Sequence, residues 1–551
     1  MSTFRIIRTS KRGNAVLAGI IVMMMVSMFG LAYITFTSTN LMRAERDERR
    51  TTAFYLAESG MEYVISKMVD ALTLNPGTLP TGSYTSEVNT VVNSLRSGAT
   101  GTGVASSAGS MTATVITSAT YRGITERVRV RVIFKNVGVW NNAIFAGIGQ
   151  SGRGINGNVD IRGSVHILGE GDPYSDTNGN GHWDPAEPFT DLNGNGVFDP
   201  GIGETFTDTD GNGVWTSAEP YQDNNLNGQY DPPLTATELA TDMGGNANIG
   251  NNYNGIPAGL SSKIPVLPTV LYKGENVQSL NAELRVKHGK VNISGSAVVG
   301  SAQIAGNGVK ETVDCCYVTN GYGGTKGASG VNSDNGTTHG YDLGDRVKFP
   351  GLFDPYKDPA TGIEYATYEN YLDSNSLVIT ESIIKSGTPS FSHSDGSGNS
   401  IAWDDITKTI TLSGIVRIDG NLDMSSKGST IYFSGRGTIF SKGTVKVHGS
   451  VMPKTMFPTT DSMGCVAKYD IEFATGSGES QLSGAGAWYA QRKMVSAKQN
   501  QFAGTYVADY FDMGTNVPSI FQVPTLASNL PPGMPGQQGV FSAQVVSWRH
   551  L

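Results

Sequence analysis

The chain has 551 residues, a formal net charge of −8 at pH 7 and 70 glycines, and charged residues make up only 16% of it. This length has room for two or three domains, and the composition is typical of turn-rich β structure. Outside an acidic segment and a short basic leader the charges balance and form no basic stripe, so we predict no nucleic-acid partner.

The first predicted element is one long helix behind a basic leader. Four basic residues precede Gly13, and no charged residue then occurs before Arg43. Such a gap is long enough for a helix to cross a bilayer, and we expect residues 14–36 to be the transmembrane part. Because no proline occurs before Pro76, the helix can continue to residue 74.

Apolar residues at spacings of three and four form one stripe along the second half of this helix. A domain packed on the stripe would leave the first half free to contact lipid or other apolar helices. The stripe consists of Phe54, Ala57, Met61, Val64, Met68 and Leu72.

Three features together carry a resemblance: the basic leader that ends in Gly13, the apolar helix after it, and the run Ala53-Phe54-Tyr55-Leu56-Ala57-Glu58-Ser59-Gly60-Met61-Glu62. With them the N-terminal region resembles type IV pilin precursors, specifically the PilX-type N-terminal region of minor pilins. The resemblance implies that residues 1–13 are a prepilin leader. A membrane-embedded prepilin peptidase would cut after Gly13 and methylate the new N-terminus, Asn14.

The same resemblance implies a single-pass precursor in the bacterial inner membrane. The pilus assembly machinery would then join it to other pilins in an extracellular filament. Most family members begin with Phe and carry Glu at mature position five, where this chain has Asn14 and Ala18. In the family that glutamate pairs with the N-terminal amine of the subunit above, so its absence favours a tip or initiating position. The alternative is that this position has simply drifted in sequence within a loosely defined group of minor pilins.

Two other interpretations of this terminus remain open. A cleaved secretory signal also has basic residues before an apolar core, but its core is shorter, about 7 to 15 residues. An uncut single-span anchor is the second alternative. Either one would still export the rest of the chain.

Residues 75–150 are predicted to be a pilin-like β-hairpin region, with loops and a short helix around Ser86–Leu95 before the hairpin. Four alternating apolar residues after a Tyr121-Arg122-Gly123 turn indicate an antiparallel hairpin with one buried face and one solvent-exposed face. By resemblance to pilins, the hairpin packs on the second half of the long helix. The apolar positions are Val128, Val130, Val132 and Phe134, and Arg127, Arg129 and Arg131 alternate with them.

The acidic segment 172–232 contains twelve Asp or Glu and no Lys or Arg. It holds four copies of a calcium-loop pattern, in which positions 1, 3, 5, 7, 9 and 12 supply oxygens and Gly at position 6 permits the sharp turn. The predicted ligands are Asp176, Asn178, Asn180, His182, Asp184 and Glu187; Asp191, Asn193, Asn195, Val197 and Asp199; Asp208, Asp210, Asn212, Val214, Thr216 and Glu219; and Asp223, Asn225, Asn227, Gln229 and Asp231. Calcium is therefore the predicted cofactor.

The four copies, called loops 1 to 4 below, are unequal. Glu187 and Glu219 stand at position 12 of loops 1 and 3, whereas loops 2 and 4 have Ile202 and Leu234 there. Glu204 lies two residues late and could substitute in loop 2. We therefore expect firm binding at loops 1 and 3. The loops resemble the short calcium repeats of extracellular bacterial proteins, and a disordered acidic linker is the alternative.

Very short strands with glycines at their corners dominate residues 151–551 and suggest a parallel β-helix or solenoid, with a β-sandwich as the alternative. The calcium repeats would project from its early coils, and residues 520–551 would cap its last coil. Of the three cysteines, Cys465 is expected to pair with Cys315 or Cys316. A vicinal disulfide between the adjacent pair is the alternative.

The predicted fold class is therefore α+β, a long pilin helix followed by a large Gly-rich β domain. We expect a minor pilin-like subunit at or near a filament tip, which contributes to assembly and to adhesion to a surface or glycan ligand. We expect no enzymatic activity, since the polar residues Asp404, Asp405, Arg417, Asp419, Arg436 and His448 have no catalytic spacing. The alternative is a membrane-anchored β-helical protein that binds carbohydrate or degrades polysaccharide.

Overall fold

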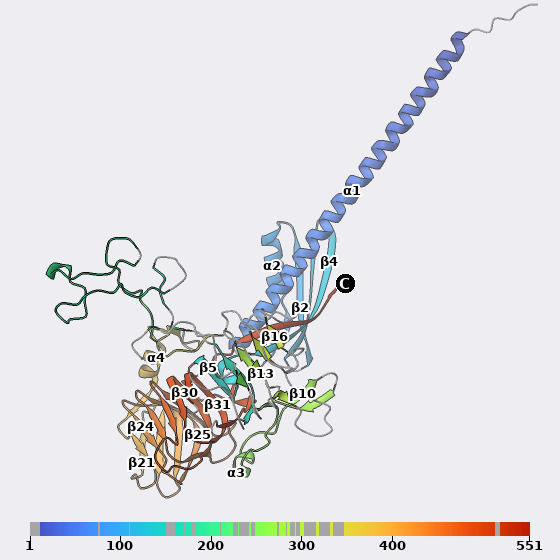
Figure 1. Cartoon of the computed structure of the whole chain (residues 1–551). Coiled ribbons are helices and arrows are strands. Elements are labelled where there is room, and N and C mark those ends of the chain that lie inside the picture. Colours follow the sequence, from blue (N-terminus) through green and yellow to red (C-terminus); the bar gives the residue numbers. More distant parts are fainter. Residues whose placement is uncertain are drawn as a thin grey trace, which may run out of the picture. The chain divides into compact units, whose positions relative to one another are not determined.

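The protein is described here from a computed structural model, shown in Figure 1. It divides into two compact units, Met1–Lys135 with Phe541–Leu551, and Asn136–Val540. The described residues are 11–74, 78–109, 111–149, 160–168, 171–172, 174–177, 183–209, 211–223, 230, 242–243, 248–272, 275–280, 282, 284–286, 292–293, 298–301, 316–318, 331–333, 347–512 and 518–551.

The first unit consists of a long helix, a short helix and one sheet. Helix α1 spans Lys11–Leu74, 64 residues or roughly 96 Å at about 1.5 Å per residue. The sheet has five strands in the order β1-β2-β3-β4-β33. The remaining elements are β1 (Gly82–Ser83), α2 (Thr85–Leu95), β2 (Thr100–Gly109), β3 (Thr112–Tyr121), β4 (Ile124–Asn136) and β33 (Phe541–His550).

The apolar stripe of α1 forms the core of this unit, as predicted. Ala57, Val64, Met68 and Leu72 are fully buried against the sheet. The Thr117 hydroxyl of β3 donates to the carbonyl of Ala57 at 2.7 Å, so this buried hydroxyl is hydrogen-bonded to the helix backbone.

The predicted hairpin is also present. Strands β3 and β4 pair in antiparallel register from Thr112↔Ile133 to Tyr121↔Ile124. Arg122 and Gly123 form the two-residue turn, with φ of 45° and 81°, which suits the twist of a hairpin. The four alternating apolar residues of β4 are buried and the arginines between them are exposed.

Strand β2 was not predicted, because its sequence is polar and rich in small residues. The reason for those residues lies in the packing of α2. A Cβ at Gly103 would lie 2.7 Å from Val88 Cγ2, and one at Gly101 would lie 2.9 Å from Val88 Cγ1. Glycine therefore lets the helix lie directly on the strand, and this constraint is invisible without the tertiary structure.

The second unit is built of many short strands. Its first half contains η1 (Val139–Asn141), β5 (Ile144–Gly149), β6 (Asp160–Arg162), β7 (Val165–Ile167), η2 (Pro200–Ile202), β8 (Asp242–Met243), β9 (Asn248–Gly250), α3 (Ala258–Ser261), β10 (Thr269–Tyr272), β11 (Glu275–Gln278), β12 (Leu284–Val286), β13 (Asn292–Ile293), β14 (Val298–Ser301), β15 (Cys316–Val318) and β16 (Val331–Ser333). Its second half contains β17 (Tyr356–Lys357), β18 (Glu364–Tyr365), α4 (Tyr368–Asn375), β19 (Leu377–Ile379), β20 (Ile383–Ile384), β21 (Phe391–Ser394), β22 (Ser400–Asp404), β23 (Thr409–Ile418), β24 (Leu422–Met424), β25 (Thr430–Ser441), β26 (Val445–Val447), β27 (Ser450–Pro453), β28 (Ser462–Ala467), β29 (Ile471–Phe473), β30 (Ser483–Ser496), β31 (Gln501–Asp512), β32 (Ser519–Phe521) and η5 (Pro524–Leu526).

Most of these strands pair in parallel with a strand of the neighbouring turn of the chain. One ladder runs in the order β19, β23, β25, β28, β30, β31, β5, β7, β12, β15 and β16. A second ladder runs from β27 through β30, β31, β32, β6 and β9 to β14. Strands near the end of the unit thus lie beside strands near its beginning, and the chain enters and leaves in the middle of the stack.

The interior of the stack is filled by aromatic and aliphatic side chains. The rings of Phe473 and Tyr506 stack at 5.1 Å with an angle of 3°, and Trp488 meets Phe473 edge-on at 5.0 Å. All three side chains are essentially fully buried. Such ring contacts add to the area that the side chains bury, so this cluster stabilises the centre of the stack.

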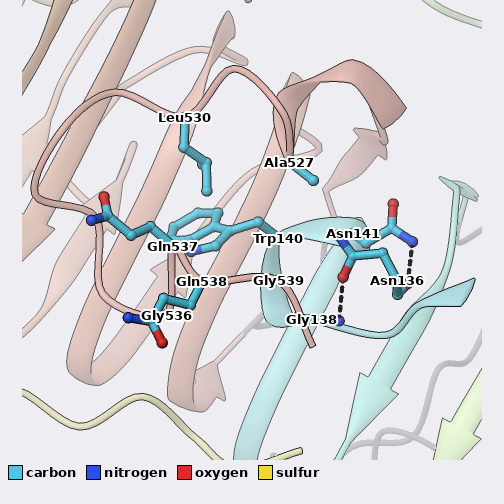
Figure 2. A pocket seen from close by; sticks show the side chains of 10 residues that line it. All are labelled: Asn136, Gly138, Trp140, Asn141, Ala527, Leu530, Gly536, Gln537, Gln538 and Gly539. Carbon is cyan, nitrogen blue, oxygen red and sulfur yellow. Dashed lines mark hydrogen bonds between the residues drawn. The ribbon is translucent and has the colours of Figure 1, made fainter. Parts of the chain in front are cut away.

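The two ends of the second unit meet each other. Val137 N donates to Val540 O at 2.7 Å, and the Trp140 indole N–H donates to Pro535 O at 2.8 Å. Figure 2 shows Trp140 near Ala527, Leu530 and residues 536–539, with the two hydrogen bonds that join Asn136 to Gly138 and Asn141. The cavity beside it is about 10 Å³, room for a single water at most.

The expected C-terminal cap over residues 520–551 is wrong for Phe541–His550. These residues form β33, an edge strand of the first unit's sheet. The sequence pattern did not show this because one strand of alternating residues fits either sheet.

Glu126 of β4 ties two other elements of the first unit to the sheet. Its carboxylate accepts from Arg50 Nε of α1 at 2.7 Å and from His550 Nε2 of β33. Burial alone would raise the pKa of Glu126, but the hydrogen bonds from His550 and Arg50 outweigh it and hold the pKa below its ordinary value.

We predict that Phe473→Ala lowers the free energy of unfolding of the second unit by about 3–5 kcal/mol, because it leaves a cavity among buried rings. Ile406→Ala is the matched control. Ile406 is 91% exposed, so its loss should change stability by no more than about 0.5 kcal/mol. Urea denaturation followed by near-ultraviolet circular dichroism measures both. Equal effects of the two substitutions would contradict the assigned core.

We predict that Glu126→Gln lowers the melting temperature at pH 7 and that this difference shrinks as the pH falls. A carboxylate with a depressed folded pKa stabilises the fold above its unfolded pKa, about 4.3, and loses that contribution as the pH falls through the folded pKa. Thermal denaturation at pH 7 and near pH 3 tests this, with exposed Glu87→Gln as the control. A difference that is the same at both pH values would contradict it.

Candidate calcium loops and the exposed half of the long helix

The long helix is divided between exposed and buried residues. From Ala15 on it is long and apolar enough to cross a membrane, and this apolar part is not buried by the described structure. Val16 and Phe29, for example, are 64% and 75% exposed, whereas Ala53 is fully buried. The packed part of α1 therefore begins close to the end of the charged segment after Arg43.

Hydroxyl groups at the end of the apolar part are satisfied within the helix. Thr35 Oγ1, Thr37 Oγ1 and Thr39 Oγ1 each donate to the carbonyl four residues earlier, at 2.7 to 2.8 Å. A hydroxyl bonded in this way can enter an apolar environment at low cost. Gly13 and Asn14, the predicted processing residues, lie in the helical backbone of α1, and the side chain of Asn14 falls outside the described part of the chain.

The acidic segment lies between β7 and β9. Loop 2 is described completely, loop 3 except for one residue, and loops 1 and 4 in part. Eight of the predicted ligands fall outside the described residues: Asn178, Asn180, His182, Asp210, Asn225, Asn227, Gln229 and Asp231.

Loop 2 folds around the side chain of Asp191. Its Oδ1 accepts from Gly194 N at 2.6 Å and its Oδ2 from Gly196 N at 2.8 Å, and these N–H groups hold its pKa below the ordinary value. Gly196, at position 6, has φ of 75°, as the predicted sharp turn requires. The amides of Asn193 and Asn195 both reach Asp199 Oδ2, at 2.9 and 2.7 Å. Positions 3, 5 and 9 therefore converge.

Loop 3 repeats this arrangement. Asp208 Oδ1 accepts from Gly211 N at 2.6 Å and Oδ2 from Gly213 N at 2.9 Å. Gly213 has φ of 76°, and the Asn212 amide donates to Thr216 Oγ1 at 3.0 Å. The side chains at positions 5 and 9 again face each other.

The expected placement of Glu187 and Glu219 in their own loops is wrong. The Glu219 carboxylate accepts from Thr177 N at 2.6 Å and from Asp184 N at 3.3 Å, both in loop 1. The Glu187 carboxylate accepts from Thr209 N at 2.6 Å and from Thr216 N at 3.1 Å, both in loop 3. The two loops have exchanged their glutamates.

Glu204 makes the same pair of contacts in loop 2. Its carboxylate accepts from Leu192 N at 2.9 Å and from Asp199 N at 2.7 Å. All three glutamates are buried. Each of these glutamates stands four residues before the first Asp of the following loop. This spacing is visible in the sequence. It is overlooked when position 12 is counted from the start of each loop.

Isolated β-bridges join the segments that precede the loops, and these bridges explain why loops 1 and 3 exchange their glutamates. Phe189 pairs with Phe206, and Tyr174 with Tyr221, in antiparallel bridges. Each loop has an aromatic residue at position 8, and these residues stack across the same pairs. Trp183 lies 4.3 Å from Tyr230, and Phe198 lies 5.3 Å from Trp215. Loops 2 and 3 therefore form one pair, and loop 1 lies against residues of loop 4.

The donor set suits calcium better than a transition metal. The loops offer carboxylate, amide, hydroxyl and carbonyl oxygens, the hard ligands that calcium prefers. Among the described residues no group of three His, Cys, Asp or Glu is gathered as a metal site. Asn193 and Asn195 can turn an amide oxygen toward a cation, since the direction of an amide is assigned from its hydrogen bonds.

The expected disulfide of Cys465 is wrong. Cys465 is a free, buried cysteine, and burial raises the pKa of its thiol. It and Cys316 lie in the same ladder, six strands apart, through Trp488, Tyr506, Ile144, Val165 and Leu284. At about 4.8 Å per strand this is roughly 29 Å, far beyond disulfide reach. Cys315 lies outside the described residues.

The polar residues weighed for catalysis pair with nearby side chains, and Arg417 and Asp419 pair with each other. Asp405 pairs with Lys408 at 2.6 Å, and Arg417 with Asp373 at 3.1 Å. His448 lies between Asp423 and Glu479, at 2.9 and 2.5 Å. The contacts of Asp404, Asp419 and Arg436 are with Thr407, Arg417 and Asn529.

Sequence reasoning missed a cavity of about 180 Å³ in the second unit. Asp354, Tyr356 and Tyr368 line it together with residues 535–538. Burial raises the pKa of Asp354 and raises that of Tyr356 to about 12. No sequence motif predicts this cavity, because its walls come from two segments that lie nearly 170 residues apart in the chain.

No family model matches the chain, and no curated protein matches it. Among solved structures it is similar to the competence-associated pilin ComZ from Thermus thermophilus, with a TM-score of 0.48 and 16% sequence identity over 91% of this chain and 97% of that chain. Such a low degree of similarity assigns neither fold nor function to this chain.

Proposed function

We propose that the chain is a minor pilin-like subunit of a type IV pilus or related filament. One observation carries the proposal: a single helix is apolar and exposed in its first half and buried against an antiparallel sheet in its second half. An exposed apolar half of this length requires lipid or other apolar helices around it. The inner membrane supplies the first environment and a bundle of pilin helices the second.

In this proposal prepilin peptidase cleaves after Gly13 and methylates Asn14, and the assembly machinery joins the subunit to other pilins. The absence of a carboxylate at Ala18 supports a position at or near the tip, because the subunit cannot pair with an N-terminal amine above it.

We infer that the second unit is a β-helix-like extracellular domain. Its parallel ladders and the repeated pairing of short strands support this interpretation. A domain of this size is easier to accommodate at a tip than along a thin fibre. Its proposed role is adhesion to a surface or glycan ligand, without catalysis.

Calcium is the proposed cofactor of the acidic segment. Twelve carboxylates with no Lys or Arg among them repel one another unless cations bind between them. The converging side chains of loops 2 and 3 and the positive φ of Gly196 and Gly213 support the proposal. Millimolar extracellular calcium would saturate modules of this kind.

The filament proposal predicts a mature N-terminus at methylated Asn14, found in sheared filaments by mass spectrometry. Gly13→Ala should retain the leader and keep the protein in the membrane fraction. Gly19→Ala is the matched control, since a Cβ at Gly19 meets nothing within 4 Å. An intact Met1 confined to membranes would contradict the proposal and favour an anchored carbohydrate-binding protein.

The calcium proposal predicts that chelation exposes residues 172–232 to proteolysis. A glutamyl endopeptidase should cut after Glu204, the one glutamate of the segment that is not followed by proline, at least about tenfold faster in EDTA than in millimolar calcium, because ligand-free loops lose their order. Trypsin serves as the control, since the segment contains no Lys or Arg. Identical glutamyl cleavage with and without calcium would contradict the proposal.

A further inference from the structure

We propose that the cavity of about 180 Å³ in the second unit binds one neutral sugar ring, the terminal residue of a glycan, and that it excludes acidic sugars. This inference rests on the proposed adhesion function, to which it adds a site and a class of ligand. Its support is the size of the cavity, the polar groups in its wall and the charge there.

The size of the cavity matches a single ring. A cavity of roughly 150 Å³ is enough to hold a six-membered ring, and this one is about 180 Å³. Pro355 and Gln538 are exposed residues of its wall. The cavity therefore meets solvent on their side, and the remainder of a glycan can extend outwards there.

The wall combines apolar surface with a few polar groups, as small-molecule sites usually do. Tyr356, Tyr368 and three prolines supply apolar surface, which suits the C–H groups of a sugar ring. The polar groups are the carboxylate of Asp354 and the amides of Gln537 and Gln538. A carboxylate only accepts hydrogen bonds, whereas an amide both donates and accepts. Sugar hydroxyls also do both, so one ring can pair with every polar group of the wall.

The charge of the wall is negative. Asp354 accepts from Gly351 N at 2.8 Å and from Gln222 Nε2 at 3.4 Å, and within the described part of the chain it has no ion pair with Lys or Arg. Lys348 is the cation that lowers its pKa, but Lys348 is exposed and does not line the cavity. An acidic sugar would bring a second negative charge to this carboxylate, which is unfavourable. A neutral hydroxyl would instead donate a hydrogen bond to it.

The two segments that form the wall are held in place before any ligand binds. Pro350 O accepts from the Tyr489 hydroxyl at 2.7 Å, and the Tyr368 hydroxyl donates to Met534 O at 3.0 Å. The second of these bonds joins one segment to the other. A Cβ at Gly536 would lie 2.9 Å from Pro350 Cγ, so the segments are also in direct contact. A site with fixed walls loses little conformational freedom on binding.

The test measures the binding of methyl glycosides to the full-length protein in a polyoxyethylene detergent, whose headgroup contains no sugar. The neutral probes are the methyl glycosides of glucose, galactose, mannose and N-acetylglucosamine. Methyl glucuronide is the acidic ring of the same size, and choline is a small cation. Saturation-transfer NMR gives the Kd of each probe. At least one neutral glycoside should bind at least about tenfold more tightly than methyl glucuronide, because the acidic ring meets the carboxylate of Asp354.

Two substitutions test whether this binding occurs in the cavity. Asp354→Asn keeps the size of the side chain and removes its charge, so it should weaken binding of the neutral glycoside at least about tenfold and bring its Kd closer to that of methyl glucuronide. A folding defect would not produce this narrowing, since it would abolish both signals. Gln538→Ala removes an exposed amide and should weaken binding at least about threefold. Exposed Gln544→Ala in β33 is the matched control and should leave the Kd unchanged.

The inference is overturned if no neutral glycoside binds, if methyl glucuronide binds as tightly as the neutral glycosides, or if choline binds and they do not. Equal Kd values for Gln538→Ala and Gln544→Ala would place the binding outside the cavity and overturn it too. Because the measurement uses purified protein, its result is independent of prepilin processing and filament assembly, which the mature N-terminus tests.

Discussion

The burial of one stripe of α1 against an antiparallel sheet is the interaction on which the first unit depends. The residues of this stripe from Ala57 to Leu72 are buried, and the hairpin of β3 and β4 supplies the complementary apolar face. The stripe holds only the second half of the helix. The first half keeps its apolar side chains exposed, so the same helix can serve as a membrane segment and later as part of a helical bundle.

The second unit is inserted between two strands of the first. The insertion begins at Asn136, the last residue of β4, and ends at Val540, just before β33, and Val137 N donates to Val540 O. A domain whose ends meet can be inserted without separating the flanking strands. The stack achieves this by pairing β31 and β32 with β5 and β6, so neither end of the chain lies at an end of the ladders.

Charge dominates the acidic segment. Its carboxylates have no neighbouring Lys or Arg in sequence, and the described ones accept instead from backbone N–H groups and neighbouring amides. Aromatic stacking brings the loops together in pairs. In the calcium proposal a cation would neutralise these loops, and metal binding would then be coupled to the order of the segment.

The sequence by itself determined the elements whose signals are local. The charge-free run after Gly13, the stripe from Ala57 to Leu72 and the alternation of β4 follow from periodicity, and the turns at Gly196 and Gly213 follow from spacing. These features depend on residues within a few positions of one another, so a single sequence contains them in full.

Which distant segments meet is visible only in the folded chain. Folding placed Phe541–His550 in the first sheet, separated Cys465 from Cys316 by six strands and brought Glu219 to loop 1. Such contacts depend on strand order and on bridges such as Phe189 with Phe206, which join residues far apart in the chain. Local patterns are compatible with several partners for each segment, and packing selects one of them.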